Sequence, residues 1–79
     1  MEVLFFGRLG EAIGRSVEID AAPADVAELR QMLAARFPAL AEELLRPSLR
    51  ACVGDELVGE AHSLADVASV DFLPPLSGG

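Results

Sequence analysis

The C-terminal segment carries the residues whose types and spacing are best suited to chemistry. It begins as an apolar stretch at 70–73, continues through Pro74 and Pro75, and ends in Gly78 and Gly79. Glycine has no Cβ and accepts backbone angles that other residues resist, so a Gly-Gly end can pass through a narrow channel. The fixed φ angles of the prolines keep the base of such an arm extended. The segment therefore predicts a stiff arm with a bare glycyl carboxylate at its tip.

Two other side chains invite a chemical role, Cys52 and His62, each the only residue of its type. A lone cysteine is commonly a small, buried apolar residue, and the neighbours of Cys52 in the sequence offer no basic activator. His62 has no ligand or base partner nearby in sequence, which favours a hydrogen-bonding role in a loop over catalysis. We therefore expect no general base, no metal site, no nucleophilic side chain and no bound cofactor.

The composition limits the class of protein. A chain of 79 residues forms one domain, and its 52% hydrophobic residues, with four Phe and no Trp or Tyr, predict a largely aliphatic core. The net charge of -7 argues against a nucleic-acid partner and favours a basic protein partner. The single cysteine fits a reducing compartment, and neither a signal peptide nor a membrane span is visible. We therefore expect a cytoplasmic protein that binds neither nucleic acid nor membrane.

The first part of the chain predicts a hairpin of two strands. The continuous apolar run at 3–6 is typical of a central strand that is buried on both faces. A short helical turn or loop is expected at 8–14. The alternating residues 16–19 indicate a half-buried second strand.

The middle of the chain carries the strongest helix signal. Asp25 and Glu28 have the spacing of a capping box, and Pro38 ends the helix near Phe37. Apolar residues at spacings of three and four form one stripe, widened by Met32: Val26, Leu29, Leu33 and Phe37. Three polar residues are expected outside the stripe: Arg30, Gln31 and Arg36.

The remaining chain alternates short elements with turns. We expect, in order, a short helix at 39–45, a strand at 49–53, a turn at 54–55, a return strand at 57–58, an irregular segment at 59–69 and a last strand at 70–73. Leu64 and Val67 are expected to anchor the irregular segment in the core. Strand pairing stops at the prolines, which cannot donate to a sheet.

This order predicts an α+β fold in which one main helix packs on one face of a mixed sheet of about five strands. Residues 1–73 form the domain and 74–79 the tail. The other face of the sheet stays open, lined by Leu4 or Phe6 and by one side of the last strand. An open apolar face indicates a partner site, so Phe72 and Leu76 are expected to contact a partner.

The same residues resemble the small subunits of molybdopterin synthase (the MoaD family), which are ubiquitin-like sulfur carriers with a β-grasp fold. The resemblance covers essentially the whole chain and is most specific in the ending Phe-Leu-Pro-Pro-Leu-Ser-Gly-Gly. It also includes the initial Val-Leu-Phe-Phe and these residues: Leu29, Arg30, Gln31, Leu57, Val58, His62, Leu64 and Asp66. Two residues depart from the family. Asp71 stands where the family favours small or apolar residues, and Leu73 stands where the family favours Phe. The family also has an Asp-Gly-Asp turn where this chain has residues 66–68, and because Val67 is poorly suited to a positive φ angle we expect a reshaped turn.

The resemblance implies a mechanism. An E1-like enzyme of the MoeB type adenylates the Gly79 carboxylate, which gives it a leaving group, and sulfur then replaces the adenylate. The resulting thiocarboxylate, a C-terminal 1-thioglycine, enters the active site of the large subunit, MoaE. There it donates sulfur to cyclic pyranopterin monophosphate to form the dithiolene of molybdopterin. The chain itself is then no enzyme but a sulfur donor.

The resemblance and the sequence patterns together assign three groups of site residues. Gly79 carries the reactive group. The residues expected to thread the channel are Gly78, Ser77 and Leu76. The residues expected to bind the partner are Phe6, Phe72, Pro74 and Pro75. The alternatives are a sulfur carrier for thiamin synthesis or tRNA thiolation, a ubiquitin-like protein modifier, and a β-grasp interaction module without chemistry at its C-terminus.

Overall fold

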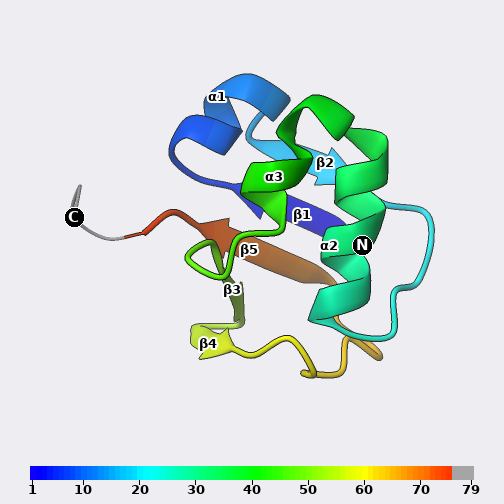
Figure 1. Ribbon diagram of the computed structural model, residues 1–79. Coiled ribbons are helices and arrows are strands. Elements are labelled where there is room, and N and C mark those ends of the chain that lie inside the picture. Colours follow the sequence, from blue (N-terminus) through cyan, green and yellow to red (C-terminus); the bar gives the residue numbers. More distant parts are fainter. Residues whose placement is uncertain (76–79) are drawn as a thin grey trace.

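The computed structural model describes residues 1–75 and shows one five-stranded mixed sheet with helices packed on it (Figure 1). The strands are β1 (Glu2–Phe5), β2 (Ser16–Glu18), β3 (Arg50–Val53), β4 (Glu56–Val58) and β5 (Ser69–Leu73). The helices are α1 (Arg8–Ile13), α2 (Val26–Arg36), the 3-10 turn η1 (Pro38–Leu40) and α3 (Ala41–Leu44). These elements agree with the order expected from the sequence and confirm the α+β class. No helix in this part of the chain is long and apolar enough to span a membrane.

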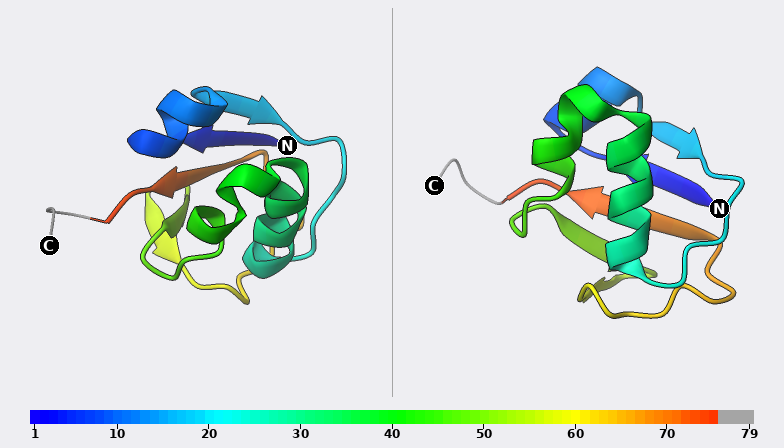
Figure 2. Two further views of the ribbon diagram at one scale, coloured as in Figure 1. Left: turned by 45° about the horizontal axis from the view of Figure 1, so that its top comes forward. Right: turned by 45° about the vertical axis from the view of Figure 1, so that its right-hand side comes forward.

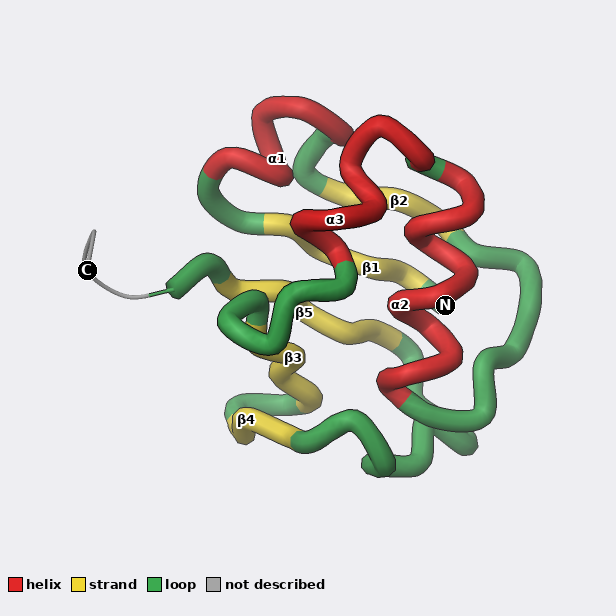
Figure 3. The backbone as a smooth tube through the Cα atoms, viewed as in Figure 1, coloured by secondary structure: helices red, strands yellow, loops and turns green. Residues whose placement is uncertain are grey.

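The first and last strands lie side by side at the centre of the sheet (Figure 3). The strand order is β2-β1-β5-β3-β4, with β1 parallel to β5 and the other neighbours antiparallel. Parallel neighbours need a long crossover connection, and the segment that contains α2 supplies it. The topology therefore places the end of β5, from which the C-terminal tail leaves, between β1 and β3.

Helices α2 and α3 cover one face of the sheet and leave the other face open (Figure 2). Burial alternates along β1 and β5, so that Val3 and Phe5, and Val70 and Phe72, point to the helices. Leu4, between Val3 and Phe5, is only partly buried. The expectation that the first strand is buried on both faces is therefore wrong, because a single helical layer covers only one side.

The side chains between α2 and the sheet form the hydrophobic core. Val26, Leu29 and Leu33 of α2 have no exposed surface. Leu64 is buried as well, and Val67 packs against the core, so the expected anchors of the irregular segment are confirmed. In the turn at 66–68, Val67 has no positive φ angle. Asp66, which tolerates the left-handed region better than Val, takes the positive φ of 62°.

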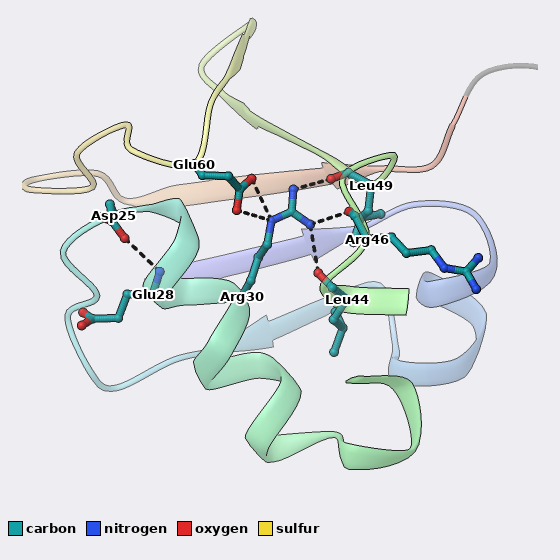
Figure 4. A network of polar contacts seen from close by, with 7 residues as sticks. All are labelled: Asp25, Glu28, Arg30, Leu44, Arg46, Leu49 and Glu60. Carbon is teal, nitrogen blue, oxygen red and sulfur yellow. Dashed lines mark hydrogen bonds and ion pairs between the residues drawn. The ribbon is translucent and has the colours of Figure 1, made fainter. Parts of the chain in front are cut away.

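Arg30 lies on the face of α2 that packs on the core, whereas it was expected outside the apolar stripe (Figure 4). It is 4% exposed. Its position is nevertheless four residues after Val26 and three before Leu33, which is the spacing of a buried helix face. The polar character of the side chain concealed this signal. The buried guanidinium is satisfied by acceptors that come from other elements and that the helix pattern cannot show.

The N-terminus of α2 is capped as its sequence indicates. Asp25 Oδ1 accepts a hydrogen bond from the backbone N–H of Glu28 at 2.9 Å. Glu28 Oε1 accepts from the N–H of Ala24 at 2.7 Å, one residue before the N–H that a standard capping box uses. The side chains of Asp25 and Glu28 therefore both fix the segment that leads into α2.

We expect Asp25→Ala to lower the free energy of unfolding by about 1 kcal/mol, because the first turn of α2 loses an acceptor for one of its free N–H groups. Urea denaturation measures this loss. Asp20→Ala is the matched control, because Asp20 is exposed and no hydrogen bond or ion pair of its side chain occurs among residues 1–75. Equal midpoints for the two variants would contradict the capping role.

Candidate functional site

The C-terminal tail leaves from the centre of the sheet. Strand β5 ends at Leu73, and Pro74 and Pro75 follow it as exposed residues outside the sheet. The N–H of Phe6 donates to Phe72 O at 3.2 Å, so the chain after β1 still holds the end of β5. The predicted end of pairing at the prolines is therefore confirmed. Leu76, Ser77, Gly78 and Gly79 lie outside the described residues, and their channel and carrier roles stay predictions.

Gly7 makes room for the root of the tail, a role that the sequence patterns did not indicate. It has a φ of +73°, and a Cβ placed on it would lie 3.0 Å from Pro74 Cγ. A side chain at this position would thus be strained by the backbone conformation and would press on the proline. The close approach of Gly7 and Pro74 sets where the tail leaves the domain.

A groove of about 560 Å³ runs beside the root of the tail. Its lining is mostly apolar and comes from the α3–β3 loop, β3, β4 and the end of β5: Pro47, Ser48, Arg50, Leu57, Leu73, Pro74 and Pro75. Arg50 supplies the one charged side chain. Such a groove can hold an apolar segment of a partner against the base of the tail.

The loop that forms one wall of this groove is held by Arg30 (Figure 4). Its Nη1 donates to Leu44 O at 2.9 Å and to Arg46 O at 3.1 Å, and its Nη2 donates to Leu49 O. Its Nε pairs with Glu60 Oε1 at 2.9 Å. Because these carbonyls lie on both sides of Pro47 and Ser48, Arg30 positions the wall from beneath. No pattern local to the groove could have identified it.

The uncovered side of the sheet continues from the groove and forms what we call the open face: Leu4, Phe6, Cys52, Leu57, Asp71 and Leu73. The pairings of Leu4 with Asp71, of Asp71 with Cys52, and of Cys52 with Leu57 align one row across four strands. Phe6 and Leu57 are 42% and 54% exposed, which is high for large apolar side chains. An open face was expected, and exposed large apolar side chains on an uncovered sheet face are typical of interaction sites.

Phe72 does not belong to the open face, so its predicted contact with a partner is wrong. Its side chain has no exposed surface, and its ring stacks on that of Phe5 with centroids 5.9 Å apart. The guanidinium carbon of Arg30 lies 5.3 Å from the ring centroid on the core side. The alternation of β5 places Phe72 with the core residue Val70 and turns Leu73 outward. Partner contacts of Phe6, Pro74 and Pro75, all exposed, stay predictions.

Neither Cys52 nor His62 lines the groove at the root of the tail. Cys52 is a residue of β3, as expected, but it is half-buried rather than buried, and its Sγ lies 3.5 Å from Gly54 O. His62 is exposed, and its backbone binds Val26 and Gly59 across the irregular segment. Among residues 1–75, no group of three or more His, Cys, Asp or Glu side chains is placed to hold a metal ion.

The sequence profile of the ThiS family matches residues 3–79, nearly the whole chain. The chain belongs to the ThiS family. It is 38% identical over 80 residues to the molybdopterin synthase sulfur carrier subunit of Escherichia coli (strain K12), covering 100% of this chain and 99% of that protein. It is 31% identical over 83 residues to the protein of the same name from Caenorhabditis briggsae, covering 100% and 96%.

The fold of this ThiS-family chain is also that of a solved structure, SAMP1 from Haloferax volcanii. The two superpose with a TM-score of 0.80 at 26% identity, covering 99% of this chain and 97% of that one. The fold is thus the ubiquitin-like β-grasp, and the resemblance to the molybdopterin synthase sulfur carriers is confirmed. In this chain the tail root, the groove and the open face adjoin one another, since Leu57 and Leu73 belong to both the groove and the open face.

Proposed function

We propose that this ThiS-family chain is the sulfur-carrier subunit of a molybdopterin synthase and that Gly79 carries the sulfur. The observation that carries the proposal is full-length similarity, at 38% and 31% identity, to two proteins named for this function. The position of the tail supports it. A rigid Pro74-Pro75 stem that leaves the middle of the sheet can enter a partner while the domain remains outside.

The proposed chemistry occurs at the carboxylate of Gly79. Attack of a carboxylate oxygen on the α-phosphorus of ATP releases pyrophosphate and forms an acyl adenylate, on an E1-like enzyme of the MoeB type. A sulfur nucleophile then displaces AMP and leaves a thiocarboxylate. The carrier docks on the large subunit, MoaE, and passes its sulfur to cyclic pyranopterin monophosphate. The chain's own contribution is to place and stiffen the tail, so it acts as a sulfur donor and not as an enzyme.

The intact mass of the chain tests this proposal. After incubation with an E1-like enzyme, ATP and a sulfur donor, we expect the mass to rise by the difference between one sulfur and one oxygen, located at Gly79 by fragmentation. Omission of ATP is the control and is expected to leave the mass unchanged. Absence of both adenylate and thiocarboxylate would refute a carrier role. A thiocarboxylate that forms on a chain unable to bind the large subunit would assign it to another sulfur-transfer pathway.

A further inference from the structure

Asp71 is the one charged residue in the middle row of the open face. Its register partners are Leu4 on β1 and Cys52 on β3, and Leu57 lies next in the row on β4. Its neighbours along the strand, Val70 and Phe72, are fully buried, so Asp71 points to the opposite side. A carboxylate therefore lies in the middle of this row, between Leu4 and Cys52, on a face whose exposed large apolar side chains are Phe6 and Leu57.

The described part of the chain provides no counter-ion for this carboxylate. None of the ion pairs or side-chain hydrogen bonds among residues 1–75 includes Asp71. Arg50 is the basic residue of the neighbouring strand β3. Its register partner on β5 is Leu73, whereas the register partner of Asp71 is Cys52. Glu2 lies on the same side of β1 as Leu4, accepts a hydrogen bond from the Ser16 hydroxyl at 2.8 Å and adds negative charge to this face. Among residues 1–75, Asp71 therefore has no cation partner.

Docking of the tail would remove that water. A standard interface covers about 800 Å² on each partner, a patch roughly 30 Å across, whereas two residues of a strand separate Asp71 from Leu73 by about 7 Å. A partner that receives the tail beyond Leu73 and fills the groove therefore also covers Asp71. Burying a carboxylate against apolar atoms is costly unless a cation pairs with it.

We infer that the partner surface carries a lysine or arginine that pairs with Asp71 at the centre of an apolar contact. This inference rests on the proposed function, in which the partner is the large subunit. Asp71 is then a specificity-determining residue. It favours a large subunit with this cation and disfavours one that presents only apolar atoms to the open face, because such a complex would bury an unpaired charge.

Calorimetric titration of the full chain with the large subunit encoded in the same genome tests the inference. Asp71→Ala is expected to raise the Kd by about 30-fold, because it leaves the partner's cation buried without its counter-charge. Asp71→Asn is expected to raise the Kd less, since its amide oxygen can still accept a hydrogen bond. Asp20→Asn, which removes one negative charge from an exposed loop outside the open face, is the matched control and is expected to change the Kd less than 2-fold. Thermal melts verify that each variant is folded.

The outcomes separate the inference from the proposed function. If the unmodified chain does not bind the large subunit, the proposed function fails and the inference fails with it. If the unmodified chain binds and Asp71→Ala binds equally well or more tightly, only the inference is overturned, because the partner then presents no cation. Asp71→Ala combined with Arg50→Ala identifies the counter-ion. If the fold-increase in Kd of the double variant equals the product of the two single increases, the partner supplies the cation. If the double variant binds no more weakly than either single variant, Arg50 is the counter-ion of Asp71 and the inference is overturned.

Discussion

Deletion of Gly79 is expected to abolish sulfur transfer while leaving the thermal stability of the chain nearly unchanged. The deletion shortens the tail by about 3.5 Å and withdraws the terminal carboxylate from the adenylating site by that length. Displacements of about 1 Å already cost on the order of 100-fold in rate, so a loss of three orders of magnitude or more is expected. Residues 1–75 contain the whole described core, which the deletion does not touch.

Two measurements check this prediction on the same protein sample. Intact mass after incubation with the E1-like enzyme, ATP and a sulfur donor reports thiocarboxylate formation, and calorimetric melting reports stability. Gly79→Ala is the matched control, because it keeps the length of the tail and adds only a methyl group beside the attacked carbonyl. Its activity is expected to lie between those of the unmodified and truncated chains. A large drop in melting temperature on deletion would mean that the tail belongs to the core.

Arg30→Met is expected to lower the free energy of unfolding by about 3 kcal/mol, because it leaves the buried carbonyls of Leu44 and Leu49 without donors. Each unsatisfied carbonyl costs about 1–3 kcal/mol, and the lost pair with Glu60 adds little, since that side chain is 53% exposed. Stabilities of small domains are about 5–15 kcal/mol, so the loss is a large fraction of the total.

Urea denaturation compares this variant with Arg36→Met, a substitution of the same type on the same helix. Within residues 1–75, the side chain of Arg36 donates one hydrogen bond, to the exposed carbonyl of Glu18 at 2.9 Å, so its loss is expected to cost less than about 1 kcal/mol. Arg30→Lys keeps the charge but cannot reach several acceptors with one ammonium group, and an intermediate loss is expected. If both methionine variants unfold at the same urea concentration, the guanidinium of Arg30 does not hold the loop between α3 and β3.

The elements that the sequence predicted correctly are those with local causes. The cap at Asp25, the end of the helix near Phe37 and the stop of β5 at Pro74 each follow from a few neighbouring residues. Hydrophobic periodicity placed the helix and the strands for the same reason. The ending of the chain was the most specific part of the family resemblance, since a paired proline and a paired glycine after an apolar strand form a local pattern.

The predictions that failed concern which side of an element is covered. Phe72 was assigned to a partner and lies in the core, and the strand β1 was expected to be buried on both faces and is buried on one. A strand pattern shows which residues share a face, but the position of the covering helix decides which face is inside. For the same reason the helix pattern did not predict that Arg30 is buried, because its hydrogen-bond acceptors come from distant residues in the segment 44–49 and at position 60.

The sequence by itself therefore determined the class of fold, the order of the helices and strands, and the Gly-Gly ending that follows two prolines. Only the tertiary structure decided that the stem leaves between β1 and β3 and packs on Gly7, and that Arg30 supports the groove. It also placed Asp71 in the middle row of the open face, without a cation partner among residues 1–75. These features depend on contacts between residues far apart in the chain. Their energies arise only when the core closes, so no local pattern encodes them.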